Sequence, residues 1–298
     1  MTSLSSIYKV YHKILSALFL HLKGGGTIRE ITEAEFSKLV GFIKQNYGIN
    51  LLQKKTLVHG RLSNYIAQSG FISFSEYFSY VENDPTGKAG VTLINKLTTN
   101  HTYFLREPQH FKFLERVALP QFAATEHATK DLRVWSAGCS TGEEPYTLAM
   151  MIDSFFGTEK YRWDTKVLAT DISTSVLETA KNAIYPTQQL ELLPDSWRVK
   201  YFRKINVEAS VLTEAIRREV IFRRFNLMNE IFPFKKKFHL ILCRNVMIYF
   251  DAETKRELIN KFYEHMEPGG YLFVGHSESV NRYESKYQFV APAVYRKV

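Results

Sequence analysis

The segment VWSAGCSTGEEPY, residues 134–146, constrains the fold more than any other part of the chain. An apolar run leads into Gly138 and Gly142, and a helical stretch begins at about Glu143. A strand, a glycine turn and a helix in this order are typical of the first crossover of a doubly wound α/β fold. Ligands bind there at the carboxyl ends of the strands. The segment therefore predicts a ligand-binding turn between this strand and this helix.

Three further apolar runs, TKVLATDI, FHLILCRN and YLFVGHSE, are separated by helical stretches. Short, continuously apolar runs are typical of the buried strands of a parallel sheet. Residues 286–298 predict a hairpin around Ala291-Pro292, which gives the open sheet an antiparallel end. Residues 184–226 form a stretch longer than one strand–helix step requires. Its apolar residues, among them Phe202, Val220 and Phe222, predict two or three strands of a small inserted β subdomain outside the main sheet.

The part of the chain before the sheet is predicted to be helical. Thr32 and Glu35 are spaced as in a capping box, and residues 27–100 contain no strand-like run. The second helix, over about residues 52–68, carries several basic side chains on its early turns. Residues 1–26 are predicted to be a leader with an amphipathic helix, because Gly24–Gly26 disconnect them from the domain that follows.

Charge and cysteine content narrow the classes of function. The formal net charge is +9 and the isoelectric point about 9.3, which favours an acidic partner: a nucleic acid, an anionic membrane or an acidic protein surface. The two cysteines, Cys139 and Cys243, are too few for a disulfide framework or a zinc site, so a reducing cytoplasm is expected. The apolar run 14–22 is too short to span a bilayer.

Acidic residues follow the glycine turn at once. Glu143 and Glu144 would repel a pyrophosphate, but they suit a cationic ligand such as S-adenosylmethionine, with its ammonium and sulfonium groups. Asp171 ends the second strand, where a carboxylate can accept both ribose hydroxyls of an adenosine. Structural alternatives stay open at this point: the two glutamates can complement the helix dipole, and Asp171 can cap the next helix.

Two other segments contain candidate site residues. In CRNVMIYF, residues 243–250, Arg244 and Tyr249 suit an anionic acceptor better than an amine, although either can be a residue at the edge of the core. The stretch LTTNHTYFLREPQHF, residues 97–111, joins the helical part to the sheet. It carries a polar set, and Phe104 is placed to cover an adenine face.

Together, LTTNxTxFxREPxHF, SAGCSTGEEPY, LATDI, and CRNVMIYF followed by GHSES resemble the CheR-type chemotaxis-receptor methyltransferases. The resemblance runs from about Thr27 to the end of the chain. It implies a helical receptor-docking domain at 27–100 and an S-adenosylmethionine-dependent methyltransferase domain at 101–298, with the inserted β subdomain at about 184–226. The implied reaction methylates receptor glutamate side chains and leaves S-adenosylhomocysteine, without a metal.

The resemblance also implies the site residues. Cofactor contacts are expected from Asn100, Thr102, Arg106, Glu143, Asp171, Asn226, Leu227, Cys243 and Arg244. Arg244 and Tyr249 are expected beside the acceptor glutamate, and Lys54, Lys55 and Arg61 on an acidic receptor helix. The expected protein is a cytoplasmic monomer that reaches the membrane only through its receptor and binds no nucleic acid.

The sequence departs from part of this family at one point. Some members use a glycine-containing loop of the β subdomain to grip a tethering peptide at the end of the receptor, but residues 199–224 contain no glycine. A tether-independent enzyme is therefore expected. Two other classes remain as alternatives: a nucleic-acid methyltransferase, which the isoelectric point favours, and an inactive adapter that binds cofactor and receptor.

Overall fold

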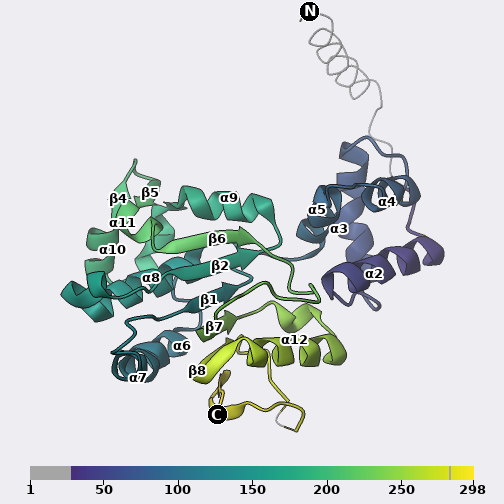
Figure 1. Ribbon diagram of the computed structural model, residues 1–298. Helices are drawn as coiled ribbons and strands as arrows, with labels where there is room; N and C mark the ends of the chain where they lie inside the picture. Colours follow the sequence, from purple (N-terminus) through teal and green to yellow (C-terminus); the bar gives the residue numbers. More distant parts are fainter. Residues whose placement is uncertain (1–27, 282) are drawn as a thin grey trace, which may run out of the picture. The chain divides into compact units, whose positions relative to one another are not determined.

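The computed structural model describes residues 28–281 and 283–298. These residues form two compact units (Figure 1). The first contains the described residues up to Gln45 together with Leu51–Thr99, and the second contains Asn46–Asn50 and Asn100–Val298. In the described part of the chain, no helix combines the length and apolarity needed to cross a membrane.

The first unit is built from helices. They are α2 (Glu33–Tyr47), α3 (Lys55–Gln68), α4 (Phe74–Glu82) and α5 (Lys88–Leu97). The predicted capping box is present: Glu35 N–H donates to Thr32 Oγ1 at 3.2 Å, and Thr32 N–H donates to Glu35 Oε2 at 2.9 Å. Ser73 caps α4 by accepting a hydrogen bond from the backbone N–H of Glu76 at 3.1 Å. Apolar side chains from the helices, such as Ile43 and Leu62, are fully buried between them.

The second unit contains a seven-stranded sheet in the order β6-β2-β1-β7-β8-β10-β9. Its strands are β1 (Val134–Ala137), β2 (Val167–Asp171), β6 (Val220–Arg224), β7 (Phe238–Cys243), β8 (Met266–Val274), β9 (Gln288–Ala291) and β10 (Val294–Arg296). The first five strands in this order run parallel, and β10 and β9 are antiparallel. Every residue of β1 and β7 is buried, which explains why both read as continuous apolar runs. The predicted doubly wound sheet with an antiparallel end is confirmed.

Helices connect and cover these strands. They are α6 (Pro108–Phe113), a π-helical turn η1 (Leu114–Ala118), α7 (Leu119–Thr125), α8 (Glu143–Phe156), α9 (Thr174–Asn182), α10 (Asp195–Tyr201), α11 (Glu214–Arg217) and α12 (Ala252–Glu264). Short 3-10 turns are η2 (Gly157–Arg162), η3 (Thr187–Leu192) and η4 (Met247–Tyr249). Both α8 and α9 pack on β2, and α12 packs on β8. The carboxyl ends of β1 and β2 therefore lie beside the amino termini of α8 and α9.

A second, three-stranded antiparallel sheet is inserted between β2 and β7. Its strands are β3 (Ile184–Pro186), β4 (Phe202–Lys204) and β5 (Ala209–Leu212), in the order β3-β5-β4. The sequence assigns Val220 and Phe222 to this insertion, and that assignment is wrong. They lie on β6, which pairs in parallel with β2 and turns these two side chains toward the core. Only pairing with a distant strand distinguishes β6 from the strands of the insertion.

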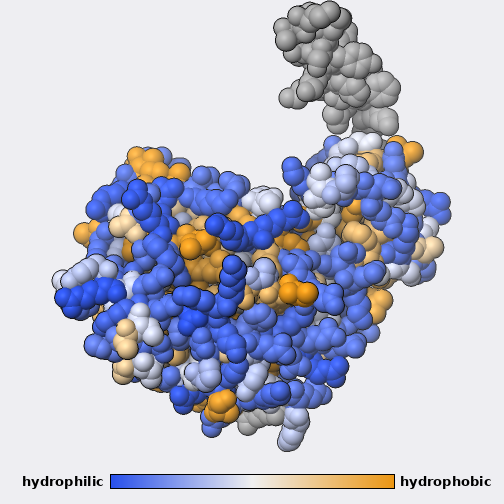
Figure 2. Space-filling model, in the orientation of Figure 1, coloured by the Kyte–Doolittle hydropathy of each residue, from blue (hydrophilic) through white to orange (hydrophobic). Residues whose placement is uncertain are grey.

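The turn between β4 and β5 is exposed and apolar. Val207 is 90% exposed and Ile205 is 52% exposed. Figure 2 shows apolar surface at this end of the insertion, while most of the face in view is hydrophilic. The side chain of Asn206 shapes the turn, because its Oδ1 accepts the backbone N–H groups of Glu208 and Ala209 at 2.9 and 2.8 Å. An asparagine thus makes a turn that glycine makes in other hairpins.

Candidate functional site

The turn after β1 requires both of its glycines. Gly138 has φ +86° and Gly142 has φ +98°, values that L side chains rarely adopt. There is also no room for a side chain at either position. A Cβ on Gly138 would lie 2.4 Å from Val246 Cγ2, and one on Gly142 would lie 2.9 Å from Tyr185 Oη. The turn therefore brings the chain close to the loop after β7, and α8 begins immediately after it.

Asp171 holds the glycine turn from the end of β2. Its Oδ2 accepts the Ser140 N–H at 2.9 Å, and its Oδ1 accepts the Ser173 N–H at 2.9 Å. Burial raises the pKa of Asp171 above its usual value, although these hydrogen bonds act in the opposite direction. The side chain that caps α9 is Ser173, which accepts the Val176 N–H. Asp171 therefore shapes the turn, while Ser173 caps the helix.

Glu143 is the first residue of α8 and is 3% exposed. Its Oε2 accepts a hydrogen bond from Thr141 Oγ1 at 2.7 Å, and burial raises its pKa. Among the described residues, neither Glu143 nor Asp171 has an ion-pair partner within 4.0 Å. Carboxylates in such surroundings are stabilised in their charged form by a nearby cation. These two residues fit a cationic ligand bound at the turn.

Arg244, the residue after β7, has a buried guanidinium that joins two other carboxylates. Its Nη1 donates to Glu144 Oε2 at 2.9 Å, and its Nη2 and Nε donate to Glu107 Oε2 at 3.1 and 3.3 Å. It also donates to the carbonyl of Arg106. Only 3% of the Arg244 side chain is exposed. The sequence predicts that this fork faces an acceptor carboxylate, but in the structure it faces carboxylates of the chain itself.

The pKa values of these two glutamates follow from the network. Burial raises the pKa of Glu144, and the charge of Arg244 only partly opposes it. Burial alone would also raise the pKa of Glu107. The hydrogen bond from the His276 backbone N–H and the charge of the Arg244 guanidinium outweigh this effect, so the pKa of Glu107 is lowered. Glu144 is fixed at its other oxygen by Ser136 Oγ at 2.7 Å. The network therefore ties α8 to the segment before α6.

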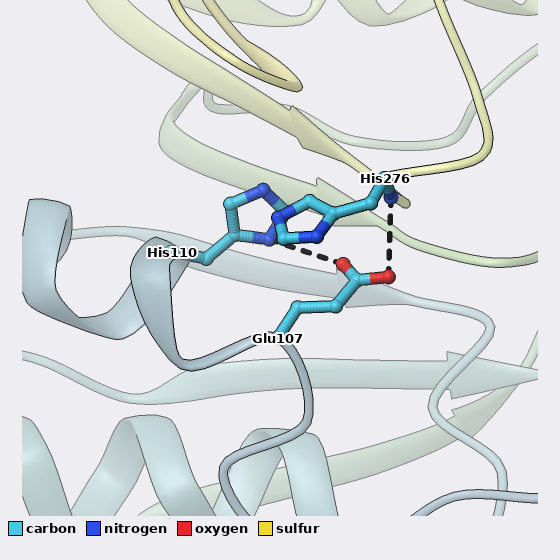
Figure 3. A group of neighbouring side chains, drawn as sticks. All are labelled: Glu107, His110 and His276. Carbon is cyan, nitrogen blue, oxygen red and sulfur yellow. Dashed lines mark hydrogen bonds and ion pairs between the residues drawn. The ribbon is translucent and has the colours of Figure 1, made fainter.

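Glu107 also lies beside two histidines, as Figure 3 shows. His110 Nδ1 is 3.4 Å from Glu107 Oε2, the His276 backbone N–H donates to Glu107 Oε1 at 3.1 Å, and the two imidazole rings lie 4.7 Å apart. Burial, with the charge of Arg244, lowers the pKa of His110 to about 4. Possible ligand atoms of the three side chains lie within 4.8 Å of one another. Because the Arg244 cation already faces Glu107, a metal ion would meet a like charge there.

The linker reaches the glycine turn and the network at several points. Ser140 Oγ donates to the carbonyl of Asn100 at 2.9 Å, and Arg106 supplies the carbonyl that Arg244 binds. The Arg106 side chain itself donates to the His101 carbonyl at 2.7 Å. Thr102 is half-buried in the same stretch. The structure thus brings the backbone of Asn100 and Arg106 to the glycine turn and to Arg244. Contact of either residue with a cofactor stays a prediction.

Phe104 is placed differently from the prediction that it covers an adenine face. Its side chain is fully buried, and its ring packs edge-on against Tyr185 and Phe202 of the inserted subdomain. A ring with no exposed face cannot stack on a ligand, so Phe104 is a core residue. The sequence pattern does not indicate the direction in which this aromatic side chain points.

The other predicted cofactor residues lie at strand ends. The Phe225 N–H donates to the Asp171 carbonyl at 3.0 Å, which brings Asn226 and Leu227 to the end of β2. Asn226 Nδ2 donates to the Asn46 carbonyl at 2.8 Å. Cys243 is the last residue of β7 and is buried, and that burial raises its pKa well above the usual value. It is therefore a neutral packing residue rather than a nucleophile.

Tyr249 ends the loop that follows Arg244. It closes the turn η4 and is half-buried, and its carbonyl accepts the Asn50 N–H at 2.7 Å. Asn245, at the start of the loop, has φ +59°. Glu278, in the GHSES segment, accepts backbone N–H groups of this loop.

The predicted docking residues belong to the first unit. Lys54 is exposed, Lys55 Nζ pairs with Glu33 Oε1 at 2.6 Å, and Arg61 Nη1 donates to the Leu97 carbonyl at 2.6 Å. The three side chains are therefore not equivalent. Arg61 holds the end of α5 in place, Lys55 is paired with Glu33 at the surface, and Lys54 is exposed.

Sequence reasoning assigned no role to Glu107 or Glu278. Each lies in a quoted motif, Glu107 in REP and Glu278 in GHSES. The signal that could have found Glu107 is the buried arginine, because a guanidinium after a buried strand needs carboxylate partners within the chain. Glu278 accepts backbone N–H groups instead, and no local pattern in the sequence marks such a partner.

The fold and the site define a class. A parallel sheet with an antiparallel end, a glycine turn after β1, and an acidic residue at the end of β2 fit a nucleotide-binding α/β fold. With two glutamates at the start of α8, they fit an S-adenosylmethionine-dependent methyltransferase. Two buried carboxylates with no ion-pair partner within 4.0 Å in the described part of the chain fit the charge of that cofactor.

Comparison with known proteins names the family. The family described as CheR methyltransferase, SAM binding domain, matches residues 100–295, and the CheR methyltransferase all-alpha domain matches residues 34–98. A chemotaxis protein methyltransferase of Borreliella burgdorferi is 42% identical over 90% of this chain and 95% of its own length. That of Escherichia coli is 35% identical over 89% of this chain and 91% of its own. The chain belongs to the CheR methyltransferase family, so the predicted family, fold and enzyme class are confirmed.

Proposed function

We propose that this enzyme transfers the methyl group of S-adenosylmethionine to glutamate side-chain carboxylates of chemotaxis receptors. The products are glutamyl methyl esters and S-adenosylhomocysteine. The observation that carries the proposal is the match of the SAM binding domain to residues 100–295. Among the described residues of that site, neither Glu143 nor Asp171 has an ion-pair partner within 4.0 Å. The curated relatives are chemotaxis protein methyltransferases in name, which supports a receptor as the methyl acceptor.

The cofactor would bind at the glycine turn, where it supplies an electrophilic methyl group. Asp171 would accept hydrogen bonds from ribose hydroxyls, and Glu143 would stabilise positive charge. The other proposed contacts are Asn100, Thr102, Arg106, Asn226, Leu227, Cys243 and Arg244. Among them, Arg244 would act mainly through the carboxylates it holds, because four of its five N–H donors are already used.

The acceptor needs no general base. A receptor glutamate with an ordinary pKa near ~4.3 is ionised at neutral pH and is a nucleophile as it stands. Catalysis then consists of holding the carboxylate in line with the methyl carbon and the sulfur, and orientation of this kind contributes up to ~7–11 kcal/mol. Tyr249 would donate one hydrogen bond to the acceptor. It has to orient the carboxylate without removing its nucleophilic lone pair.

The first unit would dock on acidic helices of the receptor through Lys54, Lys55 and Arg61. Complementary charge would raise the encounter rate. The proposed enzyme acts as a cytoplasmic monomer that uses no metal and binds no nucleic acid. The predicted leader, residues 1–26, lies outside the described residues.

A labelled-methyl assay tests this function. Full-length enzyme and S-adenosylmethionine carrying a labelled methyl group are incubated with a purified receptor cytoplasmic fragment or with total RNA. Label should enter the receptor fragment and leave it as methanol in mild alkali, because a carboxyl methyl ester hydrolyses there. Alkali-stable label in RNA would indicate a nucleic-acid methyltransferase, and receptor binding without any transfer would indicate an adapter. Either outcome would overturn the proposal.

A further inference from the structure

Glu278 is a buried carboxylate that the proposed reaction does not use. It follows β8 in the segment Gly275–Glu278 and is 6% exposed. Its Oε2 accepts the backbone N–H groups of Asn245 at 2.8 Å and Gly275 at 2.6 Å. Its Oε1 accepts the N–H of Ile248 at 3.0 Å. Both oxygens are therefore bound to backbone, and two of the three donors lie in the loop after β7.

The loop that Glu278 binds, residues 244–249, turns sharply at its start. Asn245 has φ +59°, in the left-handed region that asparagine adopts more readily than most other residues with a side chain. The end of β8 comes close enough to do this because residue 275 is glycine. A Cβ there would lie 2.6 Å from Asn245 Nδ2 and 2.8 Å from Glu278 Oε2.

The same loop forms part of the site. It begins with Arg244, which joins Glu107 to Glu144, and it ends with Tyr249. Between them, Val246 lies against Gly138 of the glycine turn, so closely that a Cβ on Gly138 would come within 2.4 Å of it. A shift of this loop would therefore move the proposed acceptor residues and the turn relative to each other.

We infer that Glu278 is a positioning residue for methyl transfer, which sets the 244–249 loop through its hydrogen bonds to backbone N–H groups. The inference rests on the proposed function for the role of Tyr249. A carboxylate suits this task because it only accepts hydrogen bonds and has room for all three donors. Glutamine has the same length, but its NH₂ group is a hydrogen-bond donor. It would face either the Ile248 N–H or the N–H groups of Asn245 and Gly275, which are donors themselves, so those hydrogen bonds would be lost.

The test compares Glu278→Gln with Glu284→Gln in the full-length enzyme. Glu284 is exposed in the next part of the same connection, so the control makes the same chemical change without touching the loop. For Glu278→Gln, kcat for receptor methylation should fall by up to about 100-fold, since small misplacements of reacting groups have effects of this size. The Kd of S-adenosylhomocysteine should change by less than about threefold. The control should match the wild type in both.

Hydrogen exchange supplies a readout that does not depend on the acceptor. The backbone amide of Ile248 should exchange roughly tenfold faster in Glu278→Gln than in the wild type, because it loses one hydrogen-bond acceptor. Unchanged exchange at Ile248 and Asn245 would overturn the inference. Faster exchange with unchanged kcat would overturn it too. The loop would then be less firmly held in the variant, and methyl transfer would not depend on how firmly it is held.

Two further results keep the test decisive. Should Glu278→Gln fail to fold, Glu278→Asp, which keeps the charge but is one methylene shorter, is measured in the same way. It should show an intermediate loss of kcat and of amide protection, and wild-type values for both would overturn the inference. A wild-type enzyme that leaves receptors unmethylated contradicts the proposed function. The exchange rates at Ile248 and Asn245 still decide whether Glu278 holds the loop.

Discussion

The carboxylates around the glycine turn fall into two pairs with different electrostatic surroundings. Glu107 and Glu144 share the buried guanidinium of Arg244, at 3.1 and 2.9 Å. Glu143 and Asp171 have no ion-pair partner among the described residues, and burial raises the pKa of both. The first pair is thus neutralised within the chain, while the second is available to a cationic ligand. Substitutions in the second pair should therefore change cofactor affinity, and substitutions in the Arg244 network should change turnover and stability.

Glu143→Gln should weaken S-adenosylmethionine binding by roughly 1–3 kcal/mol, because a charge-assisted contact is lost. In the wild type, the ionised carboxylate is the form that binds the cation. Affinity should therefore be constant above the raised pKa of Glu143 and should fall as the pH decreases through it. Titration calorimetry between pH 5 and 8 measures both effects, and Glu159→Gln, at an exposed position, is the matched control. Equal affinity in the variant would remove Glu143 from the site.

Arg244→Lys keeps the charge but loses the planar fork that reaches Glu107, Glu144 and the Arg106 carbonyl together. We expect kcat to fall at least about tenfold and the free energy of unfolding to fall by roughly 1–3 kcal/mol. Enzyme turnover and urea unfolding measure the two. Arg133→Lys is the control, since Arg133 pairs with Glu267 at 2.9 Å next to the amino end of β1. If the Arg244 variant lost no more activity than the control, the network would have no role in transfer.

His110 should make stability depend on pH. Its pKa is about 4 in the folded protein and about 6.5 in the unfolded chain, so the unfolded state binds more protons between these values. The stability is therefore complete above pH 6.5 and decreases as the pH falls toward 4, by up to about 3 kcal/mol from this group. His110→Phe should remove about 2 kcal/mol of the loss between pH 7.5 and 5. Urea unfolding at both pH values tests this, with exposed His127→Phe as control.

Among the described secondary-structure elements, the strands of the inserted sheet form no hydrogen-bonded pairs with strands of the main sheet. These strands pair only with one another, whereas β6 leaves the insertion to join β2. The turn between β4 and β5 closes through the side chain of Asn206 instead of a glycine. Members of the family that grip a receptor tail are expected to do so with a glycine-containing loop in this region.

Removal of the receptor's terminal tail should therefore have little effect on this enzyme. The expected KM and kcat for a tail-less receptor lie within about twofold of those for the intact receptor, because no contact to the tail is expected. Steady-state methylation of the two receptors measures this. A tenfold or greater rise in KM on truncation would show that the insertion binds the tail without a glycine loop.

At the scale of the whole molecule, chemistry and docking are proposed for different compact units. The candidate cofactor site lies within the second unit, and the proposed docking residues lie within the first. The net charge of +9 favours association with an acidic partner. Exposed charges are screened beyond a Debye length of ~8 Å at physiological ionic strength, so docking should depend on salt while cofactor binding should not.

Reversal of Lys54 and Lys55 to Glu should raise the KM for receptor roughly tenfold at low salt, with a smaller effect at high salt. Cofactor affinity should be unchanged. Arg61 is left out of this variant, because its bonds to Leu97 and Thr99 hold the end of α5. Reversal of Lys88 and Lys96 to Glu, at two other exposed positions of the same unit, controls for the same change in net charge. An equal effect of the control would mean that net charge alone, and not this face, recruits the receptor.

Features that depend on neighbouring residues could be predicted from the sequence alone. The glycine turn, the capping box at Thr32 and Glu35, the buried strands β1 and β7 and the family motifs all follow from local pattern. Tertiary structure decided what depends on distant partners. It turned Phe104 into the core, moved β6 to the main sheet, and gave Arg244 two carboxylates that lie 137 and 100 residues away in the chain. Backbone periodicity indicates which side chains are buried. The partners of a buried charge are fixed only when the chain closes around it, because burial without a partner is too unfavourable.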